Sequence, residues 1–175
     1  MVFIQMSGFP GSGKSRLSRE IAQKIGAVIV DHDIVKSALL DSMDTSPIDP
    51  KLAGKISYAI DWSLVDFYLS QGLSVILDSP CLYDELIEKG NALTKKYKVN
   101  YKYVECYLDN YDEIQRRLTI RKRMPSQITS APSREAFAYT IANSKKPLDI
   151  ETLTVNTALA IEEYLPEVIA YLKAE

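Results

Sequence analysis

The segment Gly8-Phe9-Pro10-Gly11-Ser12-Gly13-Lys14-Ser15 has the spacing G-x-x-x-x-G-K-S. Glycines at these positions let backbone N–H groups turn toward phosphate oxygens, and a helix after the loop directs its positive end at the same anion. Lys14 would then reach the β- and γ-phosphates, and the Ser15 hydroxyl would hold Mg²⁺. The spacing therefore predicts a binding site for a nucleoside triphosphate. The loop residues expected to bind it are Gly8, Pro10, Gly11, Ser12, Gly13, Lys14 and Ser15.

A second group of polar residues, Asp31-His32-Asp33, directly follows the apolar run Ala27–Val30. In a doubly wound sheet, ligands bind beyond the carboxyl ends of the strands, so this turn is expected to face the phosphate loop. Asp33 is placed to accept the proton of an acceptor hydroxyl. Asp31 either acts through the metal or caps the next helix. His32 is interpreted as a residue on the surface of the turn.

A third carboxylate, Asp78, follows the apolar run Val75-Ile76-Leu77. An aspartate at the end of a buried strand is typical of the group that binds Mg²⁺ beside a phosphate loop, so Ser15 and Asp78 are the candidate metal ligands. Capping of the next helix is a rival role for Asp78. Cys81, three residues further on, is interpreted as a buried and unreactive thiol.

Five basic residues lie within Arg116–Arg123, and a segment rich in proline and serine follows them. Arg117 and Arg121 are four residues apart and therefore share one face of a helix. Together these features predict a lid, at about residues 117–147, that brings arginine charge onto the transferring phosphoryl group. The alternative is a solvated helix face with cations near its C-terminus.

A long helix expected after Asp49-Pro50 carries Tyr58, Asp61, Trp62 and Asp66 on or near one side. These side chains could line an acceptor pocket. Aromatic residues at helical spacing more often pack in a core, and that is the favoured interpretation.

Apolar runs alternate with amphipathic segments along the chain, which predicts a parallel sheet with helices on both faces. Gly26 and Gln71-Gly72 are expected to end helices, whereas Pro166 is expected to kink or divide the last one. The expected strands are Val2–Met6, Ala27–Val30, Ser74–Leu77, Tyr101–Leu108 and Leu153–Val155, and the expected helices include Ile34–Leu40, Arg134–Ala142 and one from Asn110 to about Lys122.

Composition places the chain among ordinary globular proteins. Its 175 residues favour one domain, and 46% hydrophobic with 25% charged residues argues against disorder. The net charge of -2 excludes a global basic footprint for nucleic acid. No apolar run approaches the length of a spanning helix, and there is no room for a secretory signal before the phosphate loop. The two cysteines cannot form a disulfide framework. A cytoplasmic protein without a membrane partner is therefore expected.

The chain resembles the P-loop kinases, specifically the AAA_33-like and polynucleotide-kinase-like group with its zeta-toxin and chloramphenicol-phosphotransferase relatives. The resemblance implies a three-layer α/β P-loop NTPase fold, with about five parallel strands, helices on both faces and a short lid, in a single domain over residues 1–175. The residues that carry it are Gly8–Ser15, Asp31-His32-Asp33 with Lys36, Val75–Asp78, and Arg117 with Arg121.

This resemblance also implies an activity, which is transfer of the γ-phosphoryl group of ATP to a hydroxyl group with ATP and Mg²⁺ as cofactors. Lys14, Asp33 and Arg121 would be catalytic, and Arg117 and Arg121 would touch the donor phosphates. Asp33 and Lys36 would contact the acceptor. Polynucleotide 5′-hydroxyl kinases have an arginine at the position of Lys36, and a lysine lacks its planar bidentate fork.

Three functions are consistent with these residues. A small-molecule acceptor is favoured by the acidic composition and by Lys36. A polynucleotide 5′-hydroxyl acceptor is the second, and a regulatory protein that binds ATP without transferring phosphate is the third. The guanine-reading motif Asn-Lys-x-Asp does not occur, which disfavours a GTPase.

Overall fold

The computed structural model describes residues 1–43 and 48–174. One sheet of five parallel strands forms its centre, in the order β2-β3-β1-β4-β5. The strands are β1 (Val2–Ser7), β2 (Val28–Asp31), β3 (Val75–Asp78), β4 (Asn100–Tyr107) and β5 (Thr152–Asn156). The helices are α1 (Lys14–Ile25), α2 (His32–Ser42), α3 (Pro50–Ser70), α4 (Asp84–Tyr97), α5 (Tyr111–Ile120), α6 (Arg134–Ala142) and α7 (Ile161–Lys173).

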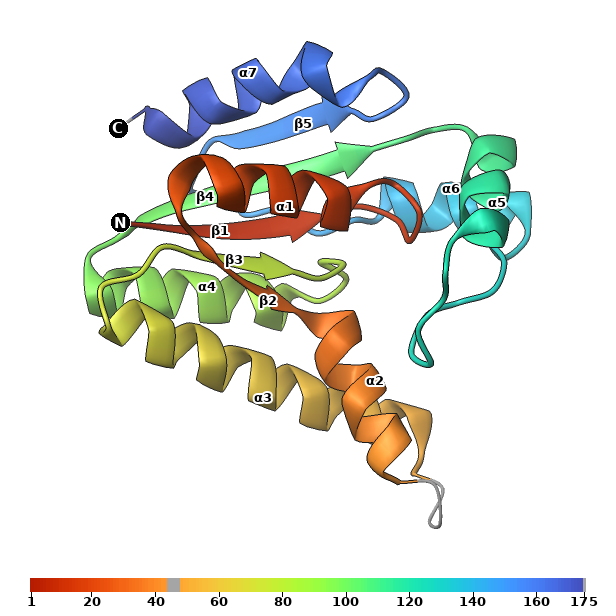
Figure 1. Cartoon of the computed structure of the whole chain (residues 1–175), viewed down its shortest axis with the longest axis horizontal. Coiled ribbons are helices and arrows are strands. Elements are labelled where there is room, and N and C mark those ends of the chain that lie inside the picture. Colours follow the sequence, from red (N-terminus) through yellow and green to blue (C-terminus); the bar gives the residue numbers. More distant parts are fainter. Residues whose placement is uncertain (44–47, 175) are drawn as a thin grey trace.

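The helices cover both faces of the sheet, as the sequence pattern predicts. Helices α1 and α7 pack on one face over a core that includes Ile4, Leu17 and Val168 (Figure 1). Helices α3 and α4 pack on the other face, where Phe3 and Trp62 belong to the core. Every residue of β1 is buried, because this strand lies in the middle of the sheet with a neighbour on each side.

Local signals set several element ends. Gly26 ends α1 in the left-handed conformation, with φ 68°, and its N–H donates to the Ala22 carbonyl. The Asp49 carboxylate caps α3 by accepting from the N–H groups of Lys51 and Leu52. Helix α7 continues through Pro166 and is not divided there.

Gly90 lies inside α4, where glycine weakens a helix. A Cβ at this position would lie 2.7 Å from the Tyr101 hydroxyl oxygen and 3.1 Å from Oε1 of Gln5. Tyr101 in turn donates a hydrogen bond to Gln5. The glycine therefore lets α4 lie against a hydrogen-bonded pair on β1 and β4.

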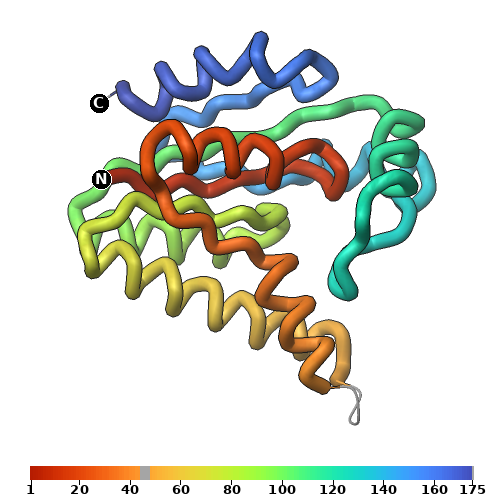
Figure 2. The backbone as a smooth tube through the Cα atoms, viewed as in Figure 1, coloured from red at the N-terminus to blue at the C-terminus, as the bar shows by residue number. Residues whose placement is uncertain are grey.

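All five strands point their carboxyl ends toward the same side of the molecule, where α2, α5 and α6 lie (Figure 1). The chain between α5 and α6 extends from the end of α5 toward α2 (Figure 2). Within the residues that the structure describes, no helix is long and apolar enough to cross a membrane.

Candidate active site at the carboxyl ends of the strands

The phosphate loop connects β1 to α1 and contains three glycines with positive φ, at Gly8 (132°), Gly11 (88°) and Gly13 (99°). Gly8 also lies against β4, because a Cβ there would be 2.3 Å from the carbonyl oxygen of Cys106. A side chain at this position would therefore push the loop off the sheet. The sequence thus uses glycine both for backbone conformation and for close packing.

Lys14 opens α1 and is nearly buried. Its ammonium donates to the carbonyl oxygens of Gly8, at 2.8 Å, and Phe9, at 3.3 Å. Among the described residues, nothing hydrogen-bonds the buried Ser12 hydroxyl. The loop therefore holds one fixed positive charge and a buried hydroxyl group for which the described residues provide no hydrogen-bond partner.

Asp31 and Asp78 end neighbouring strands and face each other in the register of β2 and β3. Asp31 caps α2, since its Oδ1 accepts from the N–H of Asp33 at 2.9 Å and from that of Ile34 at 3.4 Å. Burial, followed by the charges of Asp78 and Asp33, raises the pKa of Asp31 to about 6. Capping, one of its two candidate roles, is therefore present in the structure.

Asp78 is almost completely buried, and burial raises its pKa, while the Lys14 charge and the Ser15 hydroxyl act in the opposite direction. Asp78 does not cap the next helix, because the N-cap residue of α4 is Tyr83. In the described part of the chain, its Oδ2 has no hydrogen-bond partner. A buried carboxylate oxygen of this kind, next to a serine hydroxyl, is a suitable ligand for a divalent cation.

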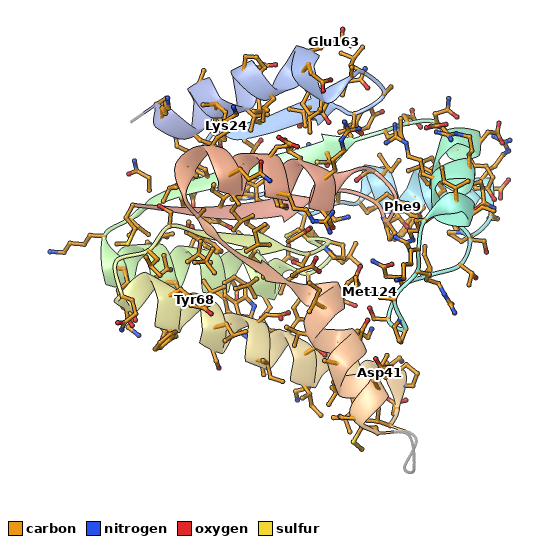
Figure 3. All side chains as sticks on the ribbon, viewed as in Figure 1. Phe9, Lys24, Asp41, Tyr68, Met124 and Glu163 are labelled. Carbon is orange, nitrogen blue, oxygen red and sulfur yellow. The ribbon has the colours of Figure 1, made fainter. Side chains whose placement is uncertain are left out.

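Residues from the loop between α5 and α6 hold the carboxylate of Asp33. Gln127 Nε2 donates to one carboxylate oxygen at 2.8 Å, and the Ser126 hydroxyl donates to the other at 3.3 Å. The Met124 N–H donates to Oε1 of Gln127 at 3.1 Å, which directs the Gln127 amino group toward Asp33. Figure 3 shows Met124 where this loop approaches α2. The sequence places these polar residues only within a lid, and nothing in it distinguishes Ser126 or Gln127 from their neighbours.

The two arginines of α5 and its C-cap make different contacts. Arg117 donates from Nε to Glu113 at 2.7 Å and from Nη2 to the Thr157 carbonyl at 2.9 Å, which links α5 to the segment after β5. Arg121 donates from Nη2 to the Ile128 carbonyl at 2.8 Å. Burial lowers the pKa of Arg121, and the Asp33 charge acts against this change. Arg121 and Asp33 therefore lie close enough for their charges to interact.

His32 is not a surface residue, and the interpretation from sequence is wrong. The side chain is buried, its Nδ1 lies 2.6 Å from Oδ2 of Asp61, and its ring stacks on Tyr58 with 4.0 Å between ring centres. The first turn of α2 packs against α3, and this packing buries the His32 side chain. Trp62 packs in the core, as expected, whereas Asp66 pairs with Lys96 near the surface.

These groups meet around one cavity of about 430 Å³. Its wall includes the loop, the ends of β2 and β3, and α5. Lys36 is not among the described residues that line this cavity. Its ammonium lies near Gly54 of α3. Gly8 and Ser12 are not among the described residues that line this cavity. The predicted site residues that line the cavity are Pro10, Gly11, Gly13, Lys14, Ser15, Asp33, Asp78, Arg117 and Arg121.

Solved structures with the same fold cover nearly the whole chain. A candidate kinase from Chloroflexus aurantiacus is 20% identical, with 98% of each chain covered and a TM-score of 0.75. A gluconokinase from Sinorhizobium meliloti is 17% identical over 97% of this chain and 90% of its own, with a TM-score of 0.61. The APS kinase of Mycobacterium tuberculosis, solved with AMPPNP and APS, is 14% identical over 98% and 97%, also with a TM-score of 0.61. The expected P-loop NTPase fold is thereby confirmed.

No curated protein matches the chain. The model of the AAA domain family AAA_33, in contrast, matches residues 3–147. The matched residues contain the phosphate loop, the strand-end aspartates, and both Arg117 and Arg121. Because the match spans most of the chain and all of these groups, the chain belongs to the AAA_33 family of AAA domains.

Proposed function

We propose that this protein transfers the γ-phosphoryl group of ATP to a hydroxyl group of a small-molecule acceptor. The observation that carries the proposal is that Lys14, Asp33 and Arg121 line one cavity with the phosphate loop. An anion-binding loop, a carboxylate and a source of arginine charge are the parts that phosphoryl transfer needs. The fold is shared with kinases, one of which was solved with AMPPNP.

Each side chain has a role that follows from its chemistry. The phosphate loop and Lys14 bind the β- and γ-phosphates, and Arg117 and Arg121 add positive charge from α5 and its C-cap. Asp33 accepts the proton of the acceptor hydroxyl. Transfer depends mostly on positioning, so the hydrogen bonds that fix Asp33 contribute to rate.

The residues present fit a magnesium ion. Ser15 and Asp78 would hold it, and the unpartnered buried oxygen of Asp78 supports this assignment. The described residues contain no cluster of three or more His, Cys, Asp or Glu side chains able to hold a metal, so phosphate oxygens and water would supply the other ligands. The ion would neutralise charge on the phosphates.

Two substitutions separate binding from transfer. Asp33→Asn should lower transfer by about 100-fold or more and change the affinity for AMPPNP by less than about threefold, because it removes a proton acceptor and not a phosphate contact. Lys14→Ala should lower both AMPPNP affinity and the rate of transfer, because the Lys14 charge acts on the phosphates when they bind and during transfer. Asp41→Asn, an exposed aspartate further along α2, serves as the matched control.

The measurements are calorimetric AMPPNP binding and release of ADP. Equal loss of binding and turnover in Asp33→Asn would contradict its role as general base. An unchanged nucleotide affinity in Lys14→Ala would contradict the phosphate site.

A further inference from the structure

A second cavity, of about 440 Å³, lies beside the phosphate loop at the ends of β1 and β4. Its wall is mostly apolar and includes Phe9, Cys106, Leu108, Ile128 and Ile141. Phe9 packs edge-on against Phe137 of α6, with 4.9 Å between ring centres, and Figure 3 shows it on the side of the loop that faces α6. This volume is within the range of small-molecule sites.

In the part of the chain that the structure describes, the wall of this cavity carries no unpaired charge. Among the described residues that line it, only Glu105 is ionisable as an acid or base at neutral pH, and its carboxylate pairs with the Lys146 ammonium at 2.6 Å. The same carboxylate accepts a hydrogen bond from the Thr154 hydroxyl at 3.0 Å. A phosphate-bearing occupant would meet this carboxylate and no available cation, so the wall suits an uncharged molecule.

The two cavities share one edge, formed by Pro10 of the phosphate loop and by Pro80 from the segment after β3. Pro10 and Pro80 line the apolar cavity and also the cavity that contains Lys14 and Asp33. A molecule in the apolar cavity can therefore place a polar end at the edge formed by these two prolines, next to the transfer site. The serine pair Ser7 and Ser144, with hydroxyl oxygens 3.3 Å apart, supplies polar groups elsewhere in the wall.

We infer that the apolar cavity binds the body of the acceptor, and that the acceptor is a compact uncharged alcohol with an aromatic or alicyclic body. This inference rests on the proposed function. In the step it implies, the hydroxyl oxygen of the alcohol forms a bond to the γ-phosphorus. The bond from that phosphorus to the β,γ-bridging oxygen breaks, ADP leaves with the electron pair, and the hydroxyl proton passes to Asp33.

The test uses 2-phenylethanol as the probe, ethylbenzene as its hydroxyl-free counterpart, and a thymidine dinucleotide with a free 5′-hydroxyl as the competing acceptor class. Methyl NMR of the wild-type protein reports occupancy at Ile128 and Ile141, with Ile25 on α1 as the internal control. Both aromatic probes should shift the two cavity methyl signals. Only 2-phenylethanol should stimulate ADP release with ATP and Mg²⁺.

Two neighbouring substitutions on α6 give a matched pair. Thr140 lines the cavity, so Thr140→Trp should fill it and reduce affinity for both aromatic probes at least tenfold. Tyr139 is 71% exposed and is not among the described residues that line the cavity. Tyr139→Trp should therefore leave affinity for both aromatic probes within twofold of the wild-type value. AMPPNP affinity should be unchanged in both variants, which also shows that they fold.

The outcomes separate this inference from the proposed function. Absence of methyl shifts with both aromatic probes overturns the inference. ADP release that the dinucleotide stimulates and 2-phenylethanol does not also overturns the inference, but it leaves the proposed kinase activity intact. Failure of the wild-type protein to bind AMPPNP contradicts the proposed function and the inference together.

Discussion

At the scale of single residues, Asp33 is held by groups that come from far along the chain. Gln127 has its own side-chain oxygen fixed by the Met124 N–H, and it donates to the Asp33 carboxylate. A general base, the role proposed for Asp33, works only when its oxygen points at the reacting hydroxyl, so this contact should affect the rate of transfer more than binding.

We therefore expect Gln127→Leu to reduce kcat about tenfold or more while nucleotide affinity stays within about twofold. Leucine has a similar size but cannot donate a hydrogen bond. Gln23→Leu, at an exposed position on α1, is the matched control. A loss that falls on AMPPNP affinity rather than on kcat would contradict a positioning role for Gln127.

Prediction from sequence works well for residues whose chemistry depends on local spacing. Gly11, Lys14 and Ser15 are fixed within one short segment, and the structure places all three at one cavity. It fails for His32, because its burial depends on Asp61 and α3, 29 residues away. Exposure that depends on distant packing cannot be derived from local pattern.

At the scale of elements, the close approach of the phosphate loop to β4 depends on Gly8. Gly8→Ala should lower the free energy of unfolding by about 3 kcal/mol or more, because the new Cβ would collide with the Cys106 backbone and the residue has positive φ. Gly26→Ala is the matched control, since it also has positive φ but no atom within 4 Å, and should cost about 1 kcal/mol.

Urea unfolding followed by circular dichroism measures both values. Equal destabilisation by the two substitutions would show that backbone conformation alone decides the effect. The packing of the loop on β4 would then contribute nothing to stability.

The N-cap of α2 gives a pH prediction. The pKa of Asp31 is raised from 3.8 to about 6, so between these pH values the folded protein binds more protons than the unfolded chain. The contribution of Asp31 to the free energy of unfolding therefore falls as pH rises from about 4 to about 6, and stays lower above that range.

Asp31→Asn keeps a capping oxygen and removes this decline. The measured quantity is the free energy of unfolding of metal-free protein without nucleotide. The difference between the variant and wild type should be about 1 to 2 kcal/mol more in favour of the variant at pH 7 than at pH 4, after allowance for solvent screening. Asp49→Asn, at the exposed cap of α3, is the matched control. Chemical unfolding at pH 4 and pH 7 checks this, and parallel behaviour of the two variants would contradict it.

Most element bounds follow from local signals, and the differences have local causes. Helix α2 starts at His32 and not at Ile34, because Asp31 and not Asp33 is its cap. Helix α5 ends at Ile120, two residues before the predicted end, because Arg121 is extended, with φ -72° and ψ 145°. Helix α6 has the predicted bounds, Arg134–Ala142.

At the scale of the whole molecule, the strand order decides which residues meet. Placing β3 between β2 and β1 brings Asp31 and Asp78 side by side and sets both next to the phosphate loop. Alternation of strands and helices predicts a parallel sheet but not this order. The second cavity depends on β1, β4, α6 and the loop before α6 together, so no single segment of the sequence indicates it.

The central claim is that the protein moves phosphate from ATP to a hydroxyl group. ADP release measured with ATP, Mg²⁺ and a panel of nucleosides, oligonucleotides, sugars and apolar alcohols tests it most directly. We expect at least one hydroxyl compound to raise ADP release about tenfold or more above the rate without acceptor, and Asp33→Asn to abolish that stimulation. Tight ATP binding with no stimulation by any member of the panel would contradict the account and indicate a protein that binds ATP without transferring its phosphate.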